Sequence, residues 1–243
     1  MEKIIAHIPH SSLFIPVEYA PLFYLSKEDL WKEQVYMTDL YTDEIFGRFT
    51  NKVVFPYSRL ICDVERFRNK EDEEMTEKGM WICYTKTSQL QSLKAVDEQH
   101  ETEILKLYDA HHQKLEKTCE TILDTHGEVL IVDCHSFHPY PLPYEYNQSP
   151  SRPDICIGVD SYHTPGELVE KMTSIYESLG YQVGINAPFS GTLTPLKYYH
   201  KNPSVKSVMI EINRKLYMDE NGQKTENFDK LKQDIMKPFI AQQ

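Results

Sequence analysis

Short apolar runs alternate with longer amphipathic stretches along the whole chain. Runs with the length and composition of strands lie at residues 3–9, 52–56, 128–134, 154–159 and 205–212, with a weaker one at 182–186. The run at 129–132, Val-Leu-Ile-Val, is apolar at every position, which is typical of a strand buried on both faces of a sheet. The pattern therefore predicts a sheet that is covered on both sides.

Stretches with helical periodicity separate these strands, at residues 27–49, 92–125, 164–179 and 225–241. Ser26 is of the residue type that caps the first of them. The third has clear ends, because Thr164 is a capping residue, Pro165 suits the first helical position and Gly180 suits the end. Strands that alternate with helices predict an α/β protein with a mostly parallel sheet.

Length and charge narrow the class of protein. The 243 residues suit a single domain over 1–243. No apolar run reaches the ~18 residues of a membrane span, and the first residues lack the basic and apolar regions of a signal peptide. The net charge is −11 and no basic stripe stands out, which argues against a nucleic-acid partner. We expect a small-molecule ligand and no membrane association.

The cysteine pattern bears on the cellular compartment. The five cysteines are odd in number and include no C-x-x-C pair. Their spacing argues against both a disulfide scaffold and a cysteine zinc knuckle. We expect reduced thiols in a cytoplasmic protein.

Residues 136–153 form a proline- and tyrosine-rich segment without any period, so they are predicted to be a loop. At 18 residues the segment exceeds the ~12–15 beyond which an irregular loop usually has a function or is disordered. It follows directly after a buried strand, at the edge of the sheet where α/β proteins bind ligands. Two interpretations stay open, a loop that covers substrate and an irregular surface insertion.

Three predicted strands end in polar clusters, which contain His10, His135 and Glu211. The carboxyl ends of parallel strands lie at one edge of a sheet, so these side chains are candidates for a common site. Imidazole and carboxylate groups are ligands for a borderline metal such as zinc. A single histidine in such a place is usually a buried, hydrogen-bonded residue, but the coincidence of His10 and His135 favours a metal site. His7 lies within its strand, and we interpret it as a buried histidine at the edge of the core.

Other polar groups have two interpretations each. Asp39 and Asp43 are four residues apart in the first predicted helix, so they share a face, which is either solvated or close to a cation. The Arg/Asp-rich segment 59–66 forms either surface ion pairs or bidentate contacts to substrate carboxylates. His111 and His112 are neighbours in a predicted helix, so they cannot both face the sheet squarely.

Nucleophilic and nucleotide-dependent chemistry have little support. The sequence contains no G-x-S-x-G elbow and no G-x-x-x-x-G-K-[ST] or G-x-G-x-x-G phosphate loop. Cys134 precedes His135 in a strand, so the two side chains point to opposite faces.

Seven stretches form an ordered series across the chain, at residues 8–12, 38–43, 58–66, 133–136, 154–158, 186–191 and 211–219. In this order they resemble the N-formylglutamate amidohydrolase family. The resemblance implies a three-layer α/β/α fold around a mixed sheet, similar to that of zinc carboxypeptidases. It also implies hydrolysis of an N-acyl amide, typically of N-formyl-L-glutamate to formate and glutamate in histidine breakdown.

The resemblance also implies roles for individual residues. His10, Asp39 and His135 match the metal ligands, with Asp43 as the alternative to Asp39. Glu211 matches the general base that receives the proton of the attacking water. Zinc is the implied ion, and other divalent transition metals such as manganese, iron or cobalt suit the same ligands.

Residues for substrate binding are also expected. Arg59 and Arg66 are candidates both for catalysis at the oxyanion and for binding substrate carboxylates. The other expected substrate-binding residues are Asp63, Asn186, Gly191 and Arg214. His112 falls where family members have a helix histidine.

The sequence departs from the family pattern at two places near the expected substrate. Thr192 replaces the second glycine of the family's N-x-P-F-x-G-G loop, and the loop after His135 is long. Position 13 is Leu13, so the H-x-x-E spacing of carboxypeptidases is missing. Two alternatives therefore stay open. One is a metallo-carboxypeptidase or amidase acting on a peptide or cell-wall fragment, and the other is a catalytically silent binding module.

Overall fold

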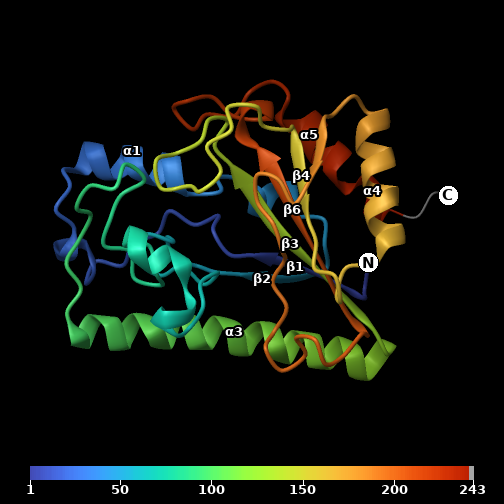
Figure 1. The fold of residues 1–243 in the computed structure, drawn as a ribbon, viewed down its shortest axis with the longest axis horizontal. Helices are drawn as coiled ribbons and strands as arrows, with labels where there is room; N and C mark the ends of the chain where they lie inside the picture. Colours follow the sequence, from blue (N-terminus) through green and yellow to red (C-terminus); the bar gives the residue numbers. More distant parts are fainter. Residues whose placement is uncertain (241–243) are drawn as a thin grey trace.

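The structure, a computed structural model, describes residues 1–240 (Figure 1). All six predicted strands form: β1 (Ile4–Ile8), β2 (Asn51–Val54), β3 (Val129–Phe137), β4 (Ile155–Gly158), β5 (Val183–Ile185) and β6 (Val205–Asn213). The α-helices are α1 (Lys27–Met37), α2 (Thr42–Ile45), α3 (Glu98–His126), α4 (Gly166–Ser178) and α5 (Phe228–Met236). Short 3-10 helices lie at Ala20–Leu22, Lys70–Asp72, Glu74–Lys78, Arg214–Leu216 and Lys237–Phe239.

The strands form one mixed sheet in the order β2-β1-β3-β6-β4-β5. Every neighbouring pair is parallel except β4 and β6, which are antiparallel. The prediction of a mostly parallel, mixed sheet is confirmed. β6 is the last strand in the chain, yet it lies in the interior of the sheet, between β3 and β4.

Helices cover both faces of this sheet, with α3 along one side and α4 and α5 on the other (Figure 1). Ile5 and Ile131 pack toward α3, where Leu115 is buried with them. Their chain neighbours Ala6 and Val132 belong to the opposite core. That core also contains Phe46 of the segment after α2, Tyr176 of α4 and Phe228 of α5. The period-2 alternation of the strands thus produces the three layers.

The first predicted helix, 27–49, is wrong in its extent. Ser26 caps α1 as predicted, accepting a hydrogen bond from the Asp29 backbone, but α1 ends at Met37. Asp39 then donates its backbone N–H to the His10 carbonyl at 2.9 Å, and Tyr41 adopts a left-handed φ of 68°. Asp39 and Asp43 therefore do not share a helix face. A tertiary backbone contact and a left-handed turn override the helical pattern.

The other helix predictions need smaller corrections. α3 begins at Glu98 rather than at 92, because Asp97 accepts a hydrogen bond from the His100 backbone as the N-cap. Thr164 does not cap α4, since its hydroxyl donates to the Ser207 carbonyl instead. Gly180 follows α4 with a φ of 91°, as predicted. The last predicted helix is shorter than 225–241, and its residue 241 lies outside the described residues.

The cysteines and the long loop agree with their predictions. All five cysteines are buried free thiols. β3 extends to Phe137, and the chain from 138 to 154 is irregular. A buried ion pair between Arg152 and Glu145 holds this loop internally. Within residues 1–240, no helix has the length and apolar character that a membrane crossing requires.

The close packing of the chain around Gly158 can be tested by substitution. A Cβ added there would overlap the Gly191 carbonyl oxygen and would lie 2.9 Å from the Met209 Cβ. Overpacking of this kind costs roughly 1–3 kcal/mol, so we expect Gly158→Ala to lower the free energy of unfolding by about that amount in urea titrations. Gly166→Ala is the matched control, because nothing lies within 4 Å of its added Cβ. Equal stability of the two variants would contradict the packing described here.

Candidate active site

The three strand ends predicted from the sequence meet at one edge of the sheet. His10 lies two residues beyond β1, His135 lies in β3, and Glu211 lies opposite His135 in the parallel register with β6. Asp39 joins them from the connection between α1 and α2, where its backbone is bonded to that of His10. Each of these four side chains is at least nine-tenths buried.

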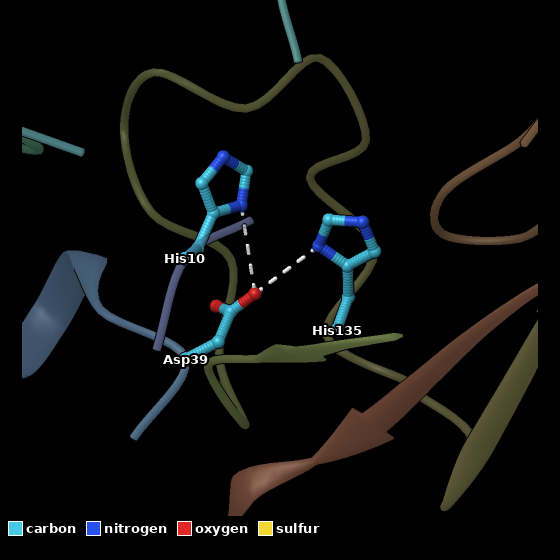
Figure 2. Close-up of side chains that lie close together, drawn as sticks. All are labelled: His10, Asp39 and His135. Carbon is cyan, nitrogen blue, oxygen red and sulfur yellow. Dashed lines mark hydrogen bonds and ion pairs between the residues drawn. The ribbon is translucent and has the colours of Figure 1, made fainter. Parts of the chain in front are cut away.

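Both imidazoles face the same carboxylate oxygen (Figure 2). The Asp39 Oδ2 atom lies 3.1 Å from His135 Nδ1 and 3.6 Å from His10 Nδ1. His10 Nδ1 is buried and has no hydrogen-bond partner. These three side chains therefore offer two nitrogen atoms and one oxygen atom to a common point.

The far nitrogen of each imidazole is bonded to further carboxylates. His10 Nε2 lies 2.8 Å from Asp63 Oδ1. His135 Nε2 lies 3.1 Å from Asp133 Oδ1 and 3.2 Å from Glu65 Oε2. An ionised carboxylate only accepts hydrogen bonds, so each Nε2 carries the hydrogen. In the neutral imidazole the Nδ1 lone pairs then point at the Asp39 carboxylate.

The lone pairs of the two Nδ1 atoms and of Asp39 Oδ2 converge at a buried point, and they repel one another unless a positive charge lies between them. Carboxylates that bond the outer nitrogen of a metal-binding histidine are the usual support for such ligands. In the metal-free protein a proton supplies this positive charge at His135: burial opposes it, but the surrounding Glu65 and Asp133 carboxylates outweigh burial and hold the pKa of this imidazole well above its ordinary value. The residues present therefore fit a divalent metal ion.

Three arginines form a rigid frame behind these carboxylates. Arg214 Nη2 donates to Asp39 Oδ1 at 2.8 Å, while its other N–H groups bind Ser136 and the carbonyls of Val35 and Tyr36. Although burial favours the neutral acid, the His10 and His135 imidazoles and Arg214 keep the pKa of Asp39 below its usual range. Arg214 thus fixes the orientation of Asp39.

The other two arginines, Arg59 and Arg66, both bind Asp63. Arg59 Nη2 and Arg66 Nη2 lie 2.8 Å and 3.3 Å from Asp63 Oδ2, and both donate to the Tyr84 hydroxyl at 3.1 Å. Arg66 is also bonded to the carbonyls of Met80 and Glu65. Arg59 keeps its Nε–H without a partner. Of the three arginines expected to bind substrate, Arg59 is therefore the one with an unpaired N–H group, and that group is buried.

Glu211 differs from the other carboxylates of the site. Its Oε2 atom is buried and has no hydrogen-bond partner. Burial raises its pKa to about 8, with His135 acting in the opposite direction and Asp39 adding to the rise. A carboxyl with a pKa near neutrality is suited to general acid–base work.

The structure also contains a cluster that the sequence analysis missed. His7 Nδ1 lies 2.9 Å from Asp133 Oδ1 and 3.3 Å from Glu65 Oε1, and His7 Nε2 lies 2.8 Å from His111 Nε2. Burial opposes charge on His7, but its contacts with the Asp133 and Glu65 carboxylates raise its pKa to about 9. His7 is thus bonded into the site as well as buried. His7 and Asp133 are register partners in adjacent parallel strands, a pairing for which the sequence carries no local signal.

Several other predicted site residues lie apart from the imidazoles. Asp43 is exposed on α2. His112 donates from Nε2 to the Val64 carbonyl at 2.8 Å and so supports the segment that carries Asp63 and Glu65. His111, its neighbour, faces His7 instead.

The loop residues Asn186 and Gly191 organise their own segment. Asn186 Oδ1 accepts hydrogen bonds from Val159 N at 2.8 Å and from Gly191 N at 3.3 Å. Gly191 has a φ of 84°, a left-handed conformation that favours glycine. The loop's outer end reaches the site, because Leu193 N donates to Asp133 Oδ2 at 3.0 Å.

Part of the loop after β3 lies next to the arginines. Leu142 and Tyr144 pack with Leu60 and Tyr84 in one apolar cluster. Leu60 directly follows Arg59 in the chain, and Tyr84 binds both Arg59 and Arg66. A role of this loop in covering substrate stays a prediction.

The structure is that of an α/β protein with a cluster of buried histidines, carboxylates and arginines at the edge of its sheet. A family model described as N-formylglutamate amidohydrolase matches residues 2–218. The chain therefore belongs to the N-formylglutamate amidohydrolase family, and it is a hydrolase that acts on an amide bond.

Two solved structures share the fold. The N-formylglutamate amidohydrolase from Ralstonia eutropha JMP134 has a TM-score of 0.82 and 19% sequence identity, covering 97% of this chain and 91% of its own. A gene product from Agrobacterium tumefaciens has a TM-score of 0.66 and 20% identity, covering 98% of this chain and 90% of its own. No curated protein sequence matches the chain.

The Arg214–Asp39 contact predicts a large loss of stability when it is broken. Arg214→Leu leaves a buried carboxylate without its cation, and such changes cost roughly 3–5 kcal/mol. We expect that loss in the free energy of unfolding measured with urea. The control is Lys32→Ala, which removes an exposed ion pair with Glu28 and should change little. A loss from Arg214→Leu no larger than that of the control would contradict the role given to Arg214.

The raised pKa of Glu211 predicts a pH-dependent stability of the metal-free protein. Between the unfolded value of 4.5 and the folded value of about 8, the folded state binds more protons than the unfolded state. Stability contributed by this group is therefore lost as the pH rises through that range. Glu211→Gln does not titrate, so its stability relative to wild type should increase from pH 5 to pH 8, by roughly 1–4 kcal/mol. A pH-independent difference would be inconsistent with the buried carboxyl described.

Proposed function

We propose that this amide hydrolase is metal-dependent and that it releases formate from an N-formyl amino acid such as N-formyl-L-glutamate. The observation that carries the proposal is the convergence of His10 Nδ1, His135 Nδ1 and Asp39 Oδ2, with both outer nitrogens held by carboxylates. The three groups would hold a zinc ion, the ion that two imidazoles and a carboxylate suit well. The family match supports the substrate class.

A bound divalent ion supplies Lewis acidity, which polarises the amide carbonyl and makes water acidic enough to react near neutral pH. The same positive charge favours the ionised form of Glu211. The Glu211 carboxylate lies in the strand adjacent to His135, where it can accept a proton from the attacking water.

The protein residues then account for the remaining proton and bond changes. The water oxygen bonds to the formyl carbon, and Glu211 takes the water proton. Glu211 returns that proton to the amine nitrogen as the carbon–nitrogen bond breaks, so formate and the free amino acid leave together.

The arginines of the site contribute to substrate binding in different ways. Arg59 has a free Nε–H, whereas Arg214 and Arg66 are bonded to Asp39, Asp63 and backbone carbonyls. We therefore assign the substrate carboxylate contact to Arg59, and the positioning of the carboxylates to Arg66 and Arg214. A charged donor of this kind also discriminates strongly against uncharged analogues.

A substrate panel tests the proposal. N-formyl-glutamate, N-formyl-aspartate, N-acetyl-glutamate and a short peptide with a free C-terminal acid are each incubated with the protein, with and without chelator and with zinc restored. We expect formate release that chelator abolishes and zinc restores. Turnover of the peptide alone would instead establish a carboxypeptidase, and chelator-resistant formate release would contradict the metal site.

Glu211→Gln tests the proton transfer separately. We expect kcat to fall by about 10²–10⁴-fold with the metal content unchanged, because the amide cannot accept the water proton. Glu167→Gln, at an exposed position on α4, is the control and should keep full activity. Near-normal turnover of the Glu211 variant would remove that residue from the mechanism.

A further inference from the structure

The carboxylates around His7 have different partners from those of Asp39 and Asp63, and the proposed reaction does not use them. Asp39 is paired with Arg214, and Asp63 is paired with Arg59 and Arg66. Within residues 1–240, by contrast, the ion pairs of Glu65 and Asp133 involve only the imidazoles of His7 and His135.

His135 cannot supply a positive charge to these carboxylates when its Nδ1 atom is a metal ligand. It is then a neutral imidazole that donates one hydrogen from Nε2. Each of the two carboxylates has an oxygen atom within 3.3 Å of His7 Nδ1, so three side chains of the types that bind metal ions converge at one point.

We propose that His7, Glu65 and Asp133 form a second binding site for a divalent transition-metal ion, next to the one at His10, Asp39 and His135. The proposal goes beyond the proposed function, because it concerns residues with no part in the proton transfers. One imidazole nitrogen and two carboxylate oxygens suit zinc or manganese.

The geometry of the three ligand atoms agrees with such a site. His7 Nδ1, one Glu65 oxygen and one Asp133 oxygen all lie within 4.8 Å of one another. Ligands about 2.1 Å from a tetrahedral ion are about 3.4 Å apart. The distances from His7 Nδ1 are 3.3 Å to Glu65 Oε1 and 2.9 Å to Asp133 Oδ1, so a small opening accommodates the ion.

Two further observations point to a ligand at this place. Glu65 Oε1 is buried and has no hydrogen-bond partner, although it faces His7. His111 Nε2 lies 2.8 Å from His7 Nε2 and can accept a hydrogen there, so His7 would still carry one hydrogen after an ion displaced the one on Nδ1.

The two sites would share their supports. Asp133 Oδ1 and Glu65 Oε2 both contact His135 Nε2, so the carboxylates that bind the second ion also orient a ligand of the first. Loss of the second ion would then weaken binding of the first without abolishing it.

Metal stoichiometry tests the second site. The protein is stripped with chelator, dialysed against excess zinc and then against buffer, and its zinc content is measured by atomic emission. We expect two equivalents for wild type and for the control Glu167→Gln. One equivalent should remain in Glu65→Gln and one in Asp39→Asn, and the double variant should hold almost none.

Wild type alone is already decisive, so a variant that fails to fold does not leave the question open. A single equivalent in wild type overturns the second site, and so does a second equivalent that Glu65→Gln and His7→Gln both retain. One equivalent with formate release would leave the proposed function standing, whereas two equivalents with no turnover of the panel would overturn the function and support the second site. Manganese in place of zinc adds an independent readout, because two neighbouring manganese ions give a spin-coupled electron paramagnetic resonance spectrum.

Discussion

The site depends on one unfavourable contact, the approach of a buried carboxylate oxygen to two imidazole nitrogens. Asp39 Oδ2 meets the Nδ1 atoms of His10 and His135, and both of those histidines are held from behind by carboxylates. Without positive charge at the meeting point, this arrangement would separate or protonate. The surrounding residues are therefore best understood as the means of holding electron-rich groups together.

The arginines mainly hold these electron-rich groups in place, and contacts with solvent or substrate are secondary. Arg214 connects Asp39 to Ser136 of β3 and to the last turn of α1, so one guanidinium fixes a loop, a strand and a helix. Arg59 and Arg66 share Asp63 with the Tyr84 hydroxyl in the same way. Buried pairs of this kind add little net stability, but they specify geometry. That is the property an acid–base centre requires.

Much of the fold and part of the site could be predicted from the sequence, because strand periodicity is a local property. The alternation of β3 places His135 on the face opposite Cys134, and the polar strand endings identify His10 and Glu211. The sequence identifies Asp39 as a candidate ligand but places it wrongly within a helix. A backbone hydrogen bond from Asp39 to His10 lies beyond the end of that helix. The His7–Asp133 contact spans 126 residues and follows from the order of strands, which no local pattern gives. Glu65 lies in an irregular segment, where period and register offer no guide.

The position of β6 has a consequence for how the chain is made. β6 is synthesised after the other five strands of the sheet, yet it pairs with both β3 and β4 in the middle of the sheet. Until residues 205–213 have been synthesised, β3 lacks one neighbour, and β4 with β5 has nothing to dock against. A nascent chain therefore carries two unpaired strand edges until β6 has been made, and such edges are prone to aggregation. Glu211 lies in this strand and Arg214 directly follows it, so the same late step that closes the sheet completes the cluster of buried polar side chains.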